Sequence, residues 1–358
     1  MKSLPFFSAM CLVLMSCANA SAQNVPDATP MKTSSGDPAQ VKTEKAFAKG
    51  SDISWLSEME ASGYPFFNKA GIRQDIFLTL KEQGMNAVRL RVWVNPADGW
   101  NGLQDVLAKA QRAKQAGMRI MIDFHYSDTW ADPAHQTKPA AWSQHSITEL
   151  RTDIAQHTSA TLLALRDAGI APEWVQVGNE TNDGMLWDSA RPSKAASNMK
   201  NYAELTTAAY DAVKQVFPTA LVIVHLANCH NNEGFRWIFD GLKSNGGKFD
   251  VIGASSYPLE AVGHTWQSAN NACLANLNDM TDRYQVPVMV TEVGVPWDHP
   301  QAKTILSDVI TKVRSVNRQL GLGVIYWEAQ SYKNWKGYSF GAFDNTGRPT
   351  EALDAFLD

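Results

Sequence analysis

Two glutamates, Glu180 and Glu292, lie at the ends of apolar segments, where their carboxylates could take part in catalysis. Each follows a short apolar run, 174–177 before Glu180 and 288–290 before Glu292. An unpaired buried carboxylate is costly, so acidic residues at the carboxyl ends of two buried strands indicate a site. Paired carboxylates are what hydrolysis of a glycosidic bond requires, because one acid protonates the departing oxygen and one carboxylate meets the developing positive charge.

The surroundings expected for the two glutamates predict different roles for them. Burial would raise the pKa of Glu180, which suits an acid that must stay protonated near neutrality, and Asn179 could donate to the hydroxyl next to the reacting carbon. Glu292, ionised near Arg91, would be a nucleophile with a depressed pKa. Taken singly, Asn179-Glu180 also fits a helix cap and Glu292 also fits a structural ion pair.

Alternating strands and helices would bring the two glutamates together. Ser146-Ile147-Thr148-Glu149 is a capping box that opens a helix to Arg166, Gly169 closes it, and 303–320 has apolar residues at helical spacing. Eight β/α units in about 310 residues suit a single (β/α)₈ TIM barrel, whose active site lies at the carboxyl ends of the strands. An open doubly wound sheet is the alternative, but no Gly-x-Gly-x-x-Gly follows the first strand. The strand candidates are 47–53, 87–94, 119–126, 173–179, 220–226, 250–256, 287–292 and 322–328.

Strand parity predicts which side chains face the lumen. Arg89, Arg91 and Trp93 share one face of the second strand, and Asp123 and His125 share one face of the third. The apolar residues between them should face the helices. Interior polar groups must be hydrogen-bonded, so we expect one network that contains Arg91, Asp123, His125, Asn179 and the two glutamates.

Other kinds of site are less well supported. His125, His225 and His230 invite a metal site, but the glutamates complete no compact ligand spacing, and neither Cys-x-x-Cys nor His-Glu-x-x-His occurs. We therefore expect no metal and no cofactor, and expect the histidines to bond to sugar hydroxyls or carboxylates. Neither the Gly-x-Ser-x-Gly elbow of serine hydrolases nor a phosphate-binding loop is present.

The composition limits the classes of partner that the protein could bind. The chain has 358 residues, with 32 Lys and Arg against 36 Asp and Glu, and no basic block that would indicate nucleic acid. We expect a monomer. Most of the 12 tryptophans should pack in the core. Those that follow predicted strand ends could stack on flat apolar faces of sugars, namely Trp93, Trp130, Trp187, Trp297 and Trp327.

The first residues read as a targeting segment. Lys2 precedes an apolar run from Phe6 to Met15 that is too short to span a bilayer, and small residues near 18–22 offer cleavage sites. We predict a signal peptide over 1–22, a disordered tether over 23–45 that is rich in Pro, Ser and Thr, and a catalytic barrel over 46–358. The protein would be secreted or periplasmic; lipid anchoring at Cys17 is the alternative, which Met15 fits poorly.

Two cysteines, Cys229 and Cys273, remain after removal of such a signal. An exported compartment permits a disulfide between them. Two separate thiols are an equal alternative.

Several motifs together resemble the family 53 glycoside hydrolases, the endo-β-1,4-galactanases that cut arabinogalactan. The resemblance runs from Lys49 to the C-terminus. Its most specific string is Ser127-Asp128-Thr129-Trp130-Ala131-Asp132-Pro133, and it is joined by Lys49 to Ser54, Val88 to Pro96, Val177 to Glu180 and Tyr326-Trp327-Glu328.

The resemblance implies a single (β/α)₈ barrel that cleaves β-1,4-galactosidic bonds in galactan or arabinogalactan with retention of configuration. Glu180 matches the family's general acid/base and Glu292 its nucleophile. Arg91, His125, Asn179, Tyr257 and Trp327 match positions around the cleaved sugar. We also expect substrate contacts from Asp128, Trp130, His225 and Trp297.

This sequence also departs from the family's pattern. Leu226-Ala227-Asn228-Cys229 replaces two acidic residues and an aromatic, Ser256 replaces the first of two tyrosines, and Ala329-Gln330 replaces a proline. The stretch 329–342 is short and has no acidic residue, so we expect no calcium site like that of bacterial relatives. Two alternatives stay open: a clan-related retaining glycosidase acting on another β-linked polysaccharide, or a glycan-binding barrel without activity.

Overall fold

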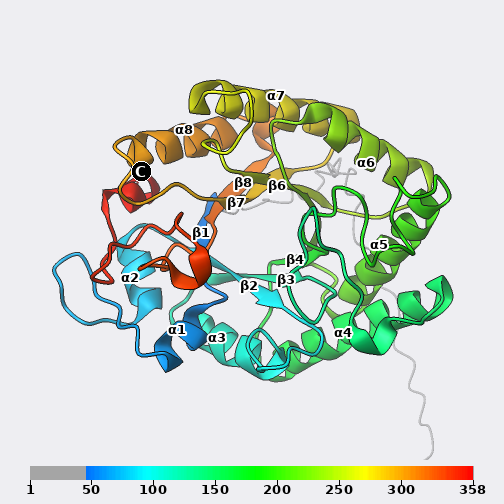
Figure 1. The fold of residues 1–358 in the computed structure, drawn as a ribbon, viewed down its shortest axis with the longest axis horizontal. Coiled ribbons are helices and arrows are strands. Elements are labelled where there is room, and N and C mark those ends of the chain that lie inside the picture. The colour runs from blue at the N-terminus through cyan, green and yellow to red at the C-terminus, as the bar shows by residue number, and fades with distance from the viewer. Residues whose placement is uncertain (1–45, 358) are drawn as a thin grey trace, which may run out of the picture. The chain divides into compact units, whose positions relative to one another are not determined.

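The computed structural model describes residues 46–357, in which eight strands alternate with helices around a closed barrel (Figure 1). Every neighbouring pair of strands is parallel, and the last strand pairs with the first. The strands are β1 (Ala48–Asp52), β2 (Ala87–Val92), β3 (Arg119–Phe124), β4 (Trp174–Val177), β5 (Leu221–Leu226), β6 (Val251–Ser256), β7 (Val288–Val293) and β8 (Gly321–Tyr326). This confirms the predicted (β/α)₈ barrel, with strand limits within three residues of those expected.

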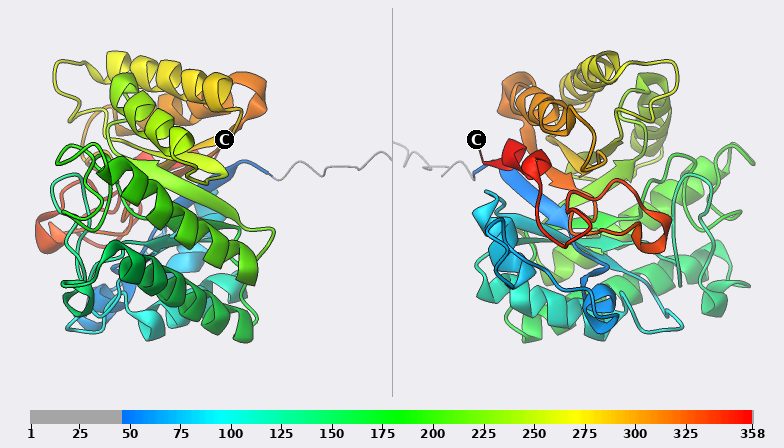
Figure 2. Two further views of the ribbon diagram at one scale, coloured as in Figure 1. Left: turned by 90° about the vertical axis from the view of Figure 1, so that its right-hand side faces the viewer. Right: turned by 60° about the vertical axis from the view of Figure 1, so that its left-hand side comes forward.

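The helices form the outer ring of the barrel, as the side views show (Figure 2). The α-helices are α1 (Leu56–Ala61), α2 (Ile76–Glu82), α3 (Leu103–Gln115), α4 (Ile147–Asp167), α5 (Asn198–Val216), α6 (Asn232–Ser244), α7 (Trp266–Tyr284) and α8 (Ala302–Arg314). Short 3-10 segments are η1 (Ala140–Trp142), η2 (Asn317–Gln319), η3 (Trp335–Gly337) and η4 (Glu351–Phe356). Between Ala46 and Leu357, no helix is long and apolar enough to cross a membrane. The predicted signal peptide (1–22) and tether (23–45) lie outside the described residues.

Local sequence explains where α4 begins and ends. The Ser146 side chain accepts from the Glu149 N–H while the Glu149 carboxylate accepts from the Ser146 N–H, which is the predicted capping box. The helix stops before Gly169, whose φ of +69° favours glycine.

The helix predicted over 303–320 is shorter than expected. α8 ends at Arg314, and Arg318 has a positive φ within η2. Val316 is buried, but it packs from the connecting segment. Gly321 is the first residue of β8, and a Cβ there would lie 1.8 Å from the Val313 carbonyl oxygen, so no larger residue fits.

The barrel lumen is filled in layers. One apolar side chain from each strand closes its lower part: Ala48, Ala87, Met121, Trp174, Ile223, Val251, Met289 and Ile325. The alternate residues of the strands, including Val88, Leu90 and Val92, pack outward beneath the helices as parity predicted. Above the apolar layer, the same inward faces carry polar residues, so the lumen changes from apolar to charged toward the carboxyl ends of the strands.

The irregular register of β7 decides where Glu292 points. Met289 lies in the lumen and Val290 lies under the helices, so strict alternation would turn Glu292 outward. The pairing of β6 with β7 shifts between Ala254 and Ser255, and this shift brings Ser255 opposite Glu292. The extra residue of such a bulge re-aims the side chain, and Glu292 faces the lumen.

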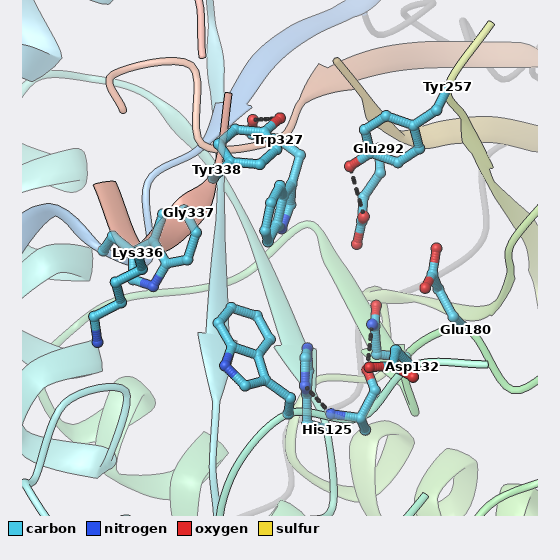
Figure 3. A pocket seen from close by; sticks show the side chains of 13 residues that line it. His125, Asp132, Glu180, Tyr257, Glu292, Trp327, Lys336, Gly337 and Tyr338 are labelled. Carbon is cyan, nitrogen blue, oxygen red and sulfur yellow. Dashed lines mark hydrogen bonds between the residues drawn. The ribbon is translucent and has the colours of Figure 1, made fainter. Parts of the chain in front are cut away.

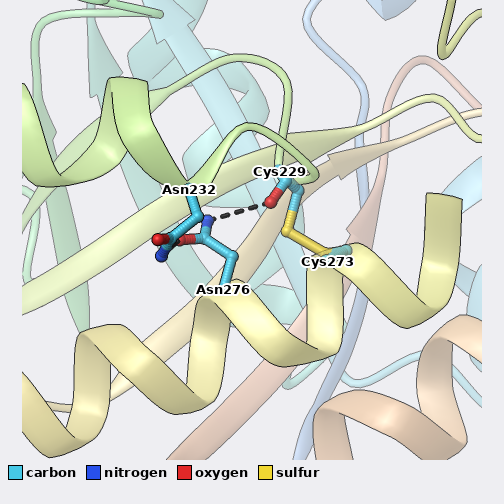
Figure 4. Close-up of a disulfide and its surroundings, with 4 residues drawn as sticks. All are labelled: Cys229, Asn232, Cys273 and Asn276. Atoms are coloured by element: carbon cyan, nitrogen blue, oxygen red, sulfur yellow. Dashed lines mark hydrogen bonds between the residues drawn. A yellow bond between two sulfur atoms is a disulfide. The ribbon is translucent and has the colours of Figure 1, made fainter. Parts of the chain in front are cut away.

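The two remaining cysteines are paired in a disulfide (Figure 4). It joins Cys229, in the loop after β5, to Cys273 on α7. Asn276 on α7 donates to the Cys229 carbonyl at 2.9 Å, and the Cys229 N–H donates to the Ser255 carbonyl at 2.9 Å. The bridge therefore fixes the β5–α6 loop against both α7 and β6.

Candidate active site

A cavity of about 400 Å³ opens at the carboxyl ends of the strands (Figure 3). Glu180 and Glu292 enter it from different strands, and their carboxyl groups point toward one another. The residues that line it are Trp55, His125, Trp130, Ala131, Asp132, Asn179, Glu180, Tyr257, Glu292, Trp327, Lys336, Gly337 and Tyr338. The cavity is therefore a mixture of carboxylates, amide, imidazole and broad aromatic surfaces.

Glu180 follows directly after β4 and has a backbone φ of +46°. Its Oε1 accepts a hydrogen bond from the Ser255 hydroxyl of β6 at 2.6 Å. Burial raises the pKa of Glu180 to about 7, against the lowering effects of Ser255 and Arg89. The raised pKa expected of an acid that is protonated near neutrality is confirmed.

Glu292 lies near the end of β7 with only 5% of its surface exposed. Arg89 of β2 contacts Glu292 Oε1 at 2.9 Å, and the Tyr257 hydroxyl donates to Glu292 Oε2 at 3.3 Å. These two donors hold the carboxylate from both of its oxygens.

Arg89, not Arg91, is the cation of this site. Its guanidinium is fully buried and also contacts Asp52 at 2.8 Å and Asp123 at 2.9 Å. It donates to Asn179 at 2.8 Å. Burial lowers the pKa of Arg89, but the charges of the three carboxylates outweigh it and raise the pKa, so Arg89 stays charged.

The expectation that Glu292 pairs with Arg91 is wrong. Arg91 points into the lumen next to β1 and β8, where it contacts Glu328 at 3.4 Å and lies over the Trp130 ring at 4.2 Å. The sequence offered a sign of this, because Arg89 shares a strand face with Arg91 and lies one step deeper. Glu328 was also missed: it is fully buried and accepts from the Trp55 N–H, so it holds the backbone of Trp55, a residue that lines the cavity.

The two glutamates titrate as a pair. Burial raises the pKa of Glu292 well above its usual range, the Arg89 guanidinium opposes this, and the charge of Glu180 adds to it. The depressed pKa expected for Glu292 is therefore wrong for the free protein. Two carboxylates that face each other cannot both ionise easily, so they share one proton. That proton belongs on Glu180, because Arg89 and Tyr257 both stabilise charge on Glu292.

His125 and Asn179 are fixed by their surroundings. His125 Nε2 is 3.0 Å from Asp123 Oδ2, and its Nδ1 accepts from the Ala131 N–H at 3.2 Å. Burial lowers the pKa of His125, which keeps the ring neutral. Asn179 donates to the Ala131 carbonyl at 2.8 Å. Both residues therefore lock the loop that carries Trp130.

An aromatic wall stands opposite the carboxylates. Trp55 and Trp327 each contact the other three rings of a cluster that also contains Trp130 and Tyr338, and the Trp327 and Tyr338 rings are perpendicular with centroids 4.6 Å apart. A packed set of rings of this kind, three of them partly exposed, offers flat apolar surface to a sugar. Trp55 and Tyr338 were not among the predicted site residues, since their segments gave no motif.

Several predicted residues lie outside the cavity lining. Asp128 accepts from the Asn95 and Ala140 N–H groups and ties two loops together. His225 is fully buried behind Asn179 and Ser255. Trp93 is buried beneath Trp130, Trp187 donates to the Asp183 carbonyl, and Trp297 is half-buried in the loop after β7. The structure thus brings together Glu180, Glu292, His125, Trp130, Asn179, Tyr257 and Trp327.

The part of the chain from 46 to 357 contains no group of three or more His, Cys, Asp or Glu side chains arranged to hold a metal ion. The predicted absence of metal and cofactor remains a prediction.

Comparison with known proteins gives consistent matches. The model of glycosyl hydrolase family 53 matches residues 48–356. An arabinogalactan endo-β-1,4-galactanase of Humicola insolens is 34% identical over 304 residues, which cover 78% of this chain and 88% of that protein. A protein of the same name from Cellvibrio japonicus is 32% identical over 350 residues, covering 87% and 90%. A solved structure of fungal β-1,4-galactanases superposes with a TM-score of 0.80 at 32% identity, covering 87% of this chain and 99% of that one.

Proposed function

The chain belongs to glycosyl hydrolase family 53, and from this premise we propose that it is a retaining endo-β-1,4-galactanase acting on galactan or arabinogalactan. The observation that carries the proposal is the pair of facing carboxyls, of which Glu180 accepts from Ser255 and Glu292 is held by Arg89 and Tyr257. The relatives' names supply the polymer, and the geometry supplies the chemistry.

Glu292 acts as the nucleophile in the first step. One of its oxygens attacks the anomeric carbon of the bound galactose, the bond from that carbon to the leaving oxygen breaks, and the proton of Glu180 moves to the leaving oxygen. Arg89 and Tyr257 hold Glu292 in one orientation, which supports in-line attack. The carboxyl groups should lie about 5–5.5 Å apart for this double displacement.

Glu180 reverses its role in the second step. Now ionised, it takes a proton from water, the resulting hydroxide attacks the anomeric carbon, and the bond to Glu292 breaks. Two inversions give a product with the starting configuration. A pKa of about 7 suits a group that must give a proton in one step and take one in the next.

The aromatic wall would bind the sugar at the point of cleavage. Trp327 and Trp130 line the cavity, and galactose has an apolar face that such rings can cover. His125 and Asn179 would complete the site by bonding to ring hydroxyls.

A reducing-sugar screen on β-1,4-galactan, mannan, xylan and glucan tests the polymer. Release from galactan alone supports the proposal; release from another polymer alone assigns the chain to a different β-linked substrate. Tight galactan binding with no reducing ends over long incubation would make it a binding protein.

Two matched variants test the residues. Glu292→Gln should release no measurable reducing ends. Glu180→Gln should lose about 10²- to 10⁴-fold on galactan but keep most of its first-step rate on an aryl galactoside whose leaving group needs no proton. Glu260→Gln, an exposed carboxyl on the β6–α7 loop outside the cavity, should keep full activity. Unchanged activity in Glu292→Gln with the fold intact would sink the assignment.

A further inference from the structure

The acid/base carboxyl is held from behind by a second pair of side chains. Ser255 Oγ lies 2.6 Å from Glu180 Oε1 and 2.8 Å from His225 Nε2. Both residues are at most 1% exposed and come from neighbouring strands, β6 and β5. Neither lines the cavity, so neither can touch the substrate directly.

The direction of these hydrogen bonds follows from their chemistry. The Ser255 hydroxyl donates to Glu180 Oε1, which accepts whether the carboxyl is ionised or carries its proton on Oε2, so Ser255 must accept from His225. His225 therefore carries its proton on Nε2. Its Nδ1 can then accept from the Gln176 amide N–H at 3.0 Å. Asn179 Oδ1 also lies 3.0 Å from Nδ1 but accepts from Arg89 and not from His225. Burial lowers the pKa of His225 well below its usual value, which keeps the ring neutral.

The same chain of contacts reaches the other carboxyl. Gln176 also accepts from Arg89 Nε at 3.2 Å, and Arg89 contacts Glu292. One continuous series of buried polar groups on β2, β4, β5 and β6 thus connects Glu292 of β7 with Glu180. The orientation of Glu180 is therefore set by groups outside the cavity lining, and that of Glu292 partly so, because Tyr257 lines the cavity.

We propose that Ser255, oriented by His225, is the positioning residue of Glu180. Its hydroxyl donates to Oε1 through both steps of the reaction, so that Oε2 carries and delivers the proton. The inference rests on the proposed function. Among residues 46–357, Ser255 is the one side chain that forms a hydrogen bond with the Glu180 carboxyl. A carboxyl free to rotate would offer either oxygen, and a misplaced proton lowers the rate steeply.

Other charged or titratable groups that face Glu180 act on it through space. They come from β2, β3, β7 and the loops after β3 and β6, and they are Arg89, Asp123, Glu292, Asp132 and Tyr257. None of them changes in a Ser255 variant. A change in the titration of Glu180 in such a variant is therefore attributable to the lost hydroxyl.

Ser255→Ala is the direct test, with Ser256→Ala as its matched control. Ser256 is the next residue of β6 but faces the helices, beside Asn270 and Cys273. In Ser255→Ala the carboxylate of Glu180 loses a donor, so its pKa should rise by about one unit. The alkaline limb of kcat/KM on galactan should move upward by the same amount, and the maximum should fall about 10- to 100-fold.

A substrate with an activated leaving group separates positioning from general damage. The first step on an aryl galactoside of an acidic phenol needs no proton, so kcat/KM on it should stay within about threefold in Ser255→Ala. Equal losses on both substrates, or an unmoved alkaline limb, would overturn the proposal. Ser255→Thr, which restores the hydroxyl, should recover the limb.

Two spectroscopic measurements do not depend on any substrate. Carboxyl ¹³C titration of Glu180, assigned with Glu180→Gln, should give the higher pKa in Ser255→Ala and the native pKa in Ser256→Ala. Ring ¹⁵N shifts should place the His225 proton on Nε2; a proton on Nδ1 would contradict the hydrogen-bond direction. If the native chain fails to cleave galactan, the proposed function falls, whereas these two measurements still decide the role of Ser255.

Discussion

Replacement of Arg89 by methionine is the sharpest test of how the lumen is held together. The guanidinium lies within 2.8–2.9 Å of carboxylate oxygens of Asp52, Asp123 and Glu292, and all four side chains are buried. At an effective dielectric constant of about 20, each pair contributes about 4 kcal/mol of attraction. Removing the cation therefore leaves more uncompensated charge than a folded interior tolerates.

The cost is limited by protonation of a carboxyl. Keeping a carboxyl with a solution pKa of about 4.3 protonated at pH 7 costs about 3.7 kcal/mol, since one pH unit is worth about 1.4 kcal/mol. We therefore expect Arg89→Met to lower the free energy of unfolding by about 4 kcal/mol at pH 7, which agrees with the usual cost of about 3–5 kcal/mol for breaking a buried pair.

The sign of the pH dependence follows from the same proton. In the variant, the carboxyl that takes the proton has a folded-state pKa raised above its unfolded value, so the folded state binds one proton more than the unfolded state. The stabilising contribution of this bound proton is fully present below about pH 4 and is lost as the pH rises. The stability deficit of Arg89→Met should therefore shrink by about 1.4 kcal/mol for each pH unit from pH 7 toward pH 4.

Urea unfolding followed by tryptophan fluorescence at pH 5, 6 and 7 measures this. Arg112→Met is the matched control, because Arg112 also contacts two carboxylates, Glu60 and Asp75, but at the surface. It should cost less than about 1 kcal/mol. The reasoning is refuted if Arg89→Met costs no more than Arg112→Met, or if its deficit does not change with pH.

Two further predictions concern the acid/base and the disulfide. Because burial raises the pKa of Glu180 to about 7 and the acid must be protonated, kcat/KM on galactan should fall above about pH 7, approaching tenfold per unit; a profile that stays flat to pH 9 would contradict the assignment. The bridge from Cys229 to Cys273 closes a loop with a sequence separation of 44, for which chain entropy predicts a contribution of about 4 kcal/mol to the free energy of unfolding. The double serine variant should have a free energy of unfolding lower by up to that amount than the oxidised chain, and equal to that of the reduced chain.

Much of the fold could be predicted because it depends on residues that are close together in the sequence. The capping box at Ser146, the glycine after α4 and the alternation of apolar residues in β2 and β3 depend on neighbours within a few positions. Helix and strand periods are properties of the backbone, so eight β/α units could be counted before any contact was known. The limit appears at α8, where apolar spacing continued beyond Arg314 but the backbone turned.

The roles within the site needed more than local pattern. Parity placed Arg89 and Arg91 on the lumen face, yet it could not say which of them meets Glu292, because the strands around the barrel are staggered and each arginine faces different neighbours. The pairing of Arg89 with Glu292 and of Arg91 with Glu328 is decided across 203 and 237 positions of sequence.

The sequence by itself determined the barrel, the two strand-end glutamates and the inward faces of the second and third strands, because these follow from backbone period and side-chain type. Only the tertiary structure decided that the bulge in β7 turns Glu292 inward, that Arg89 neutralises it, and that Ser255 and His225 stand behind Glu180. The physical reason is that pKa and orientation depend on distance and burial, which arise only when residues far apart in the chain close around one lumen.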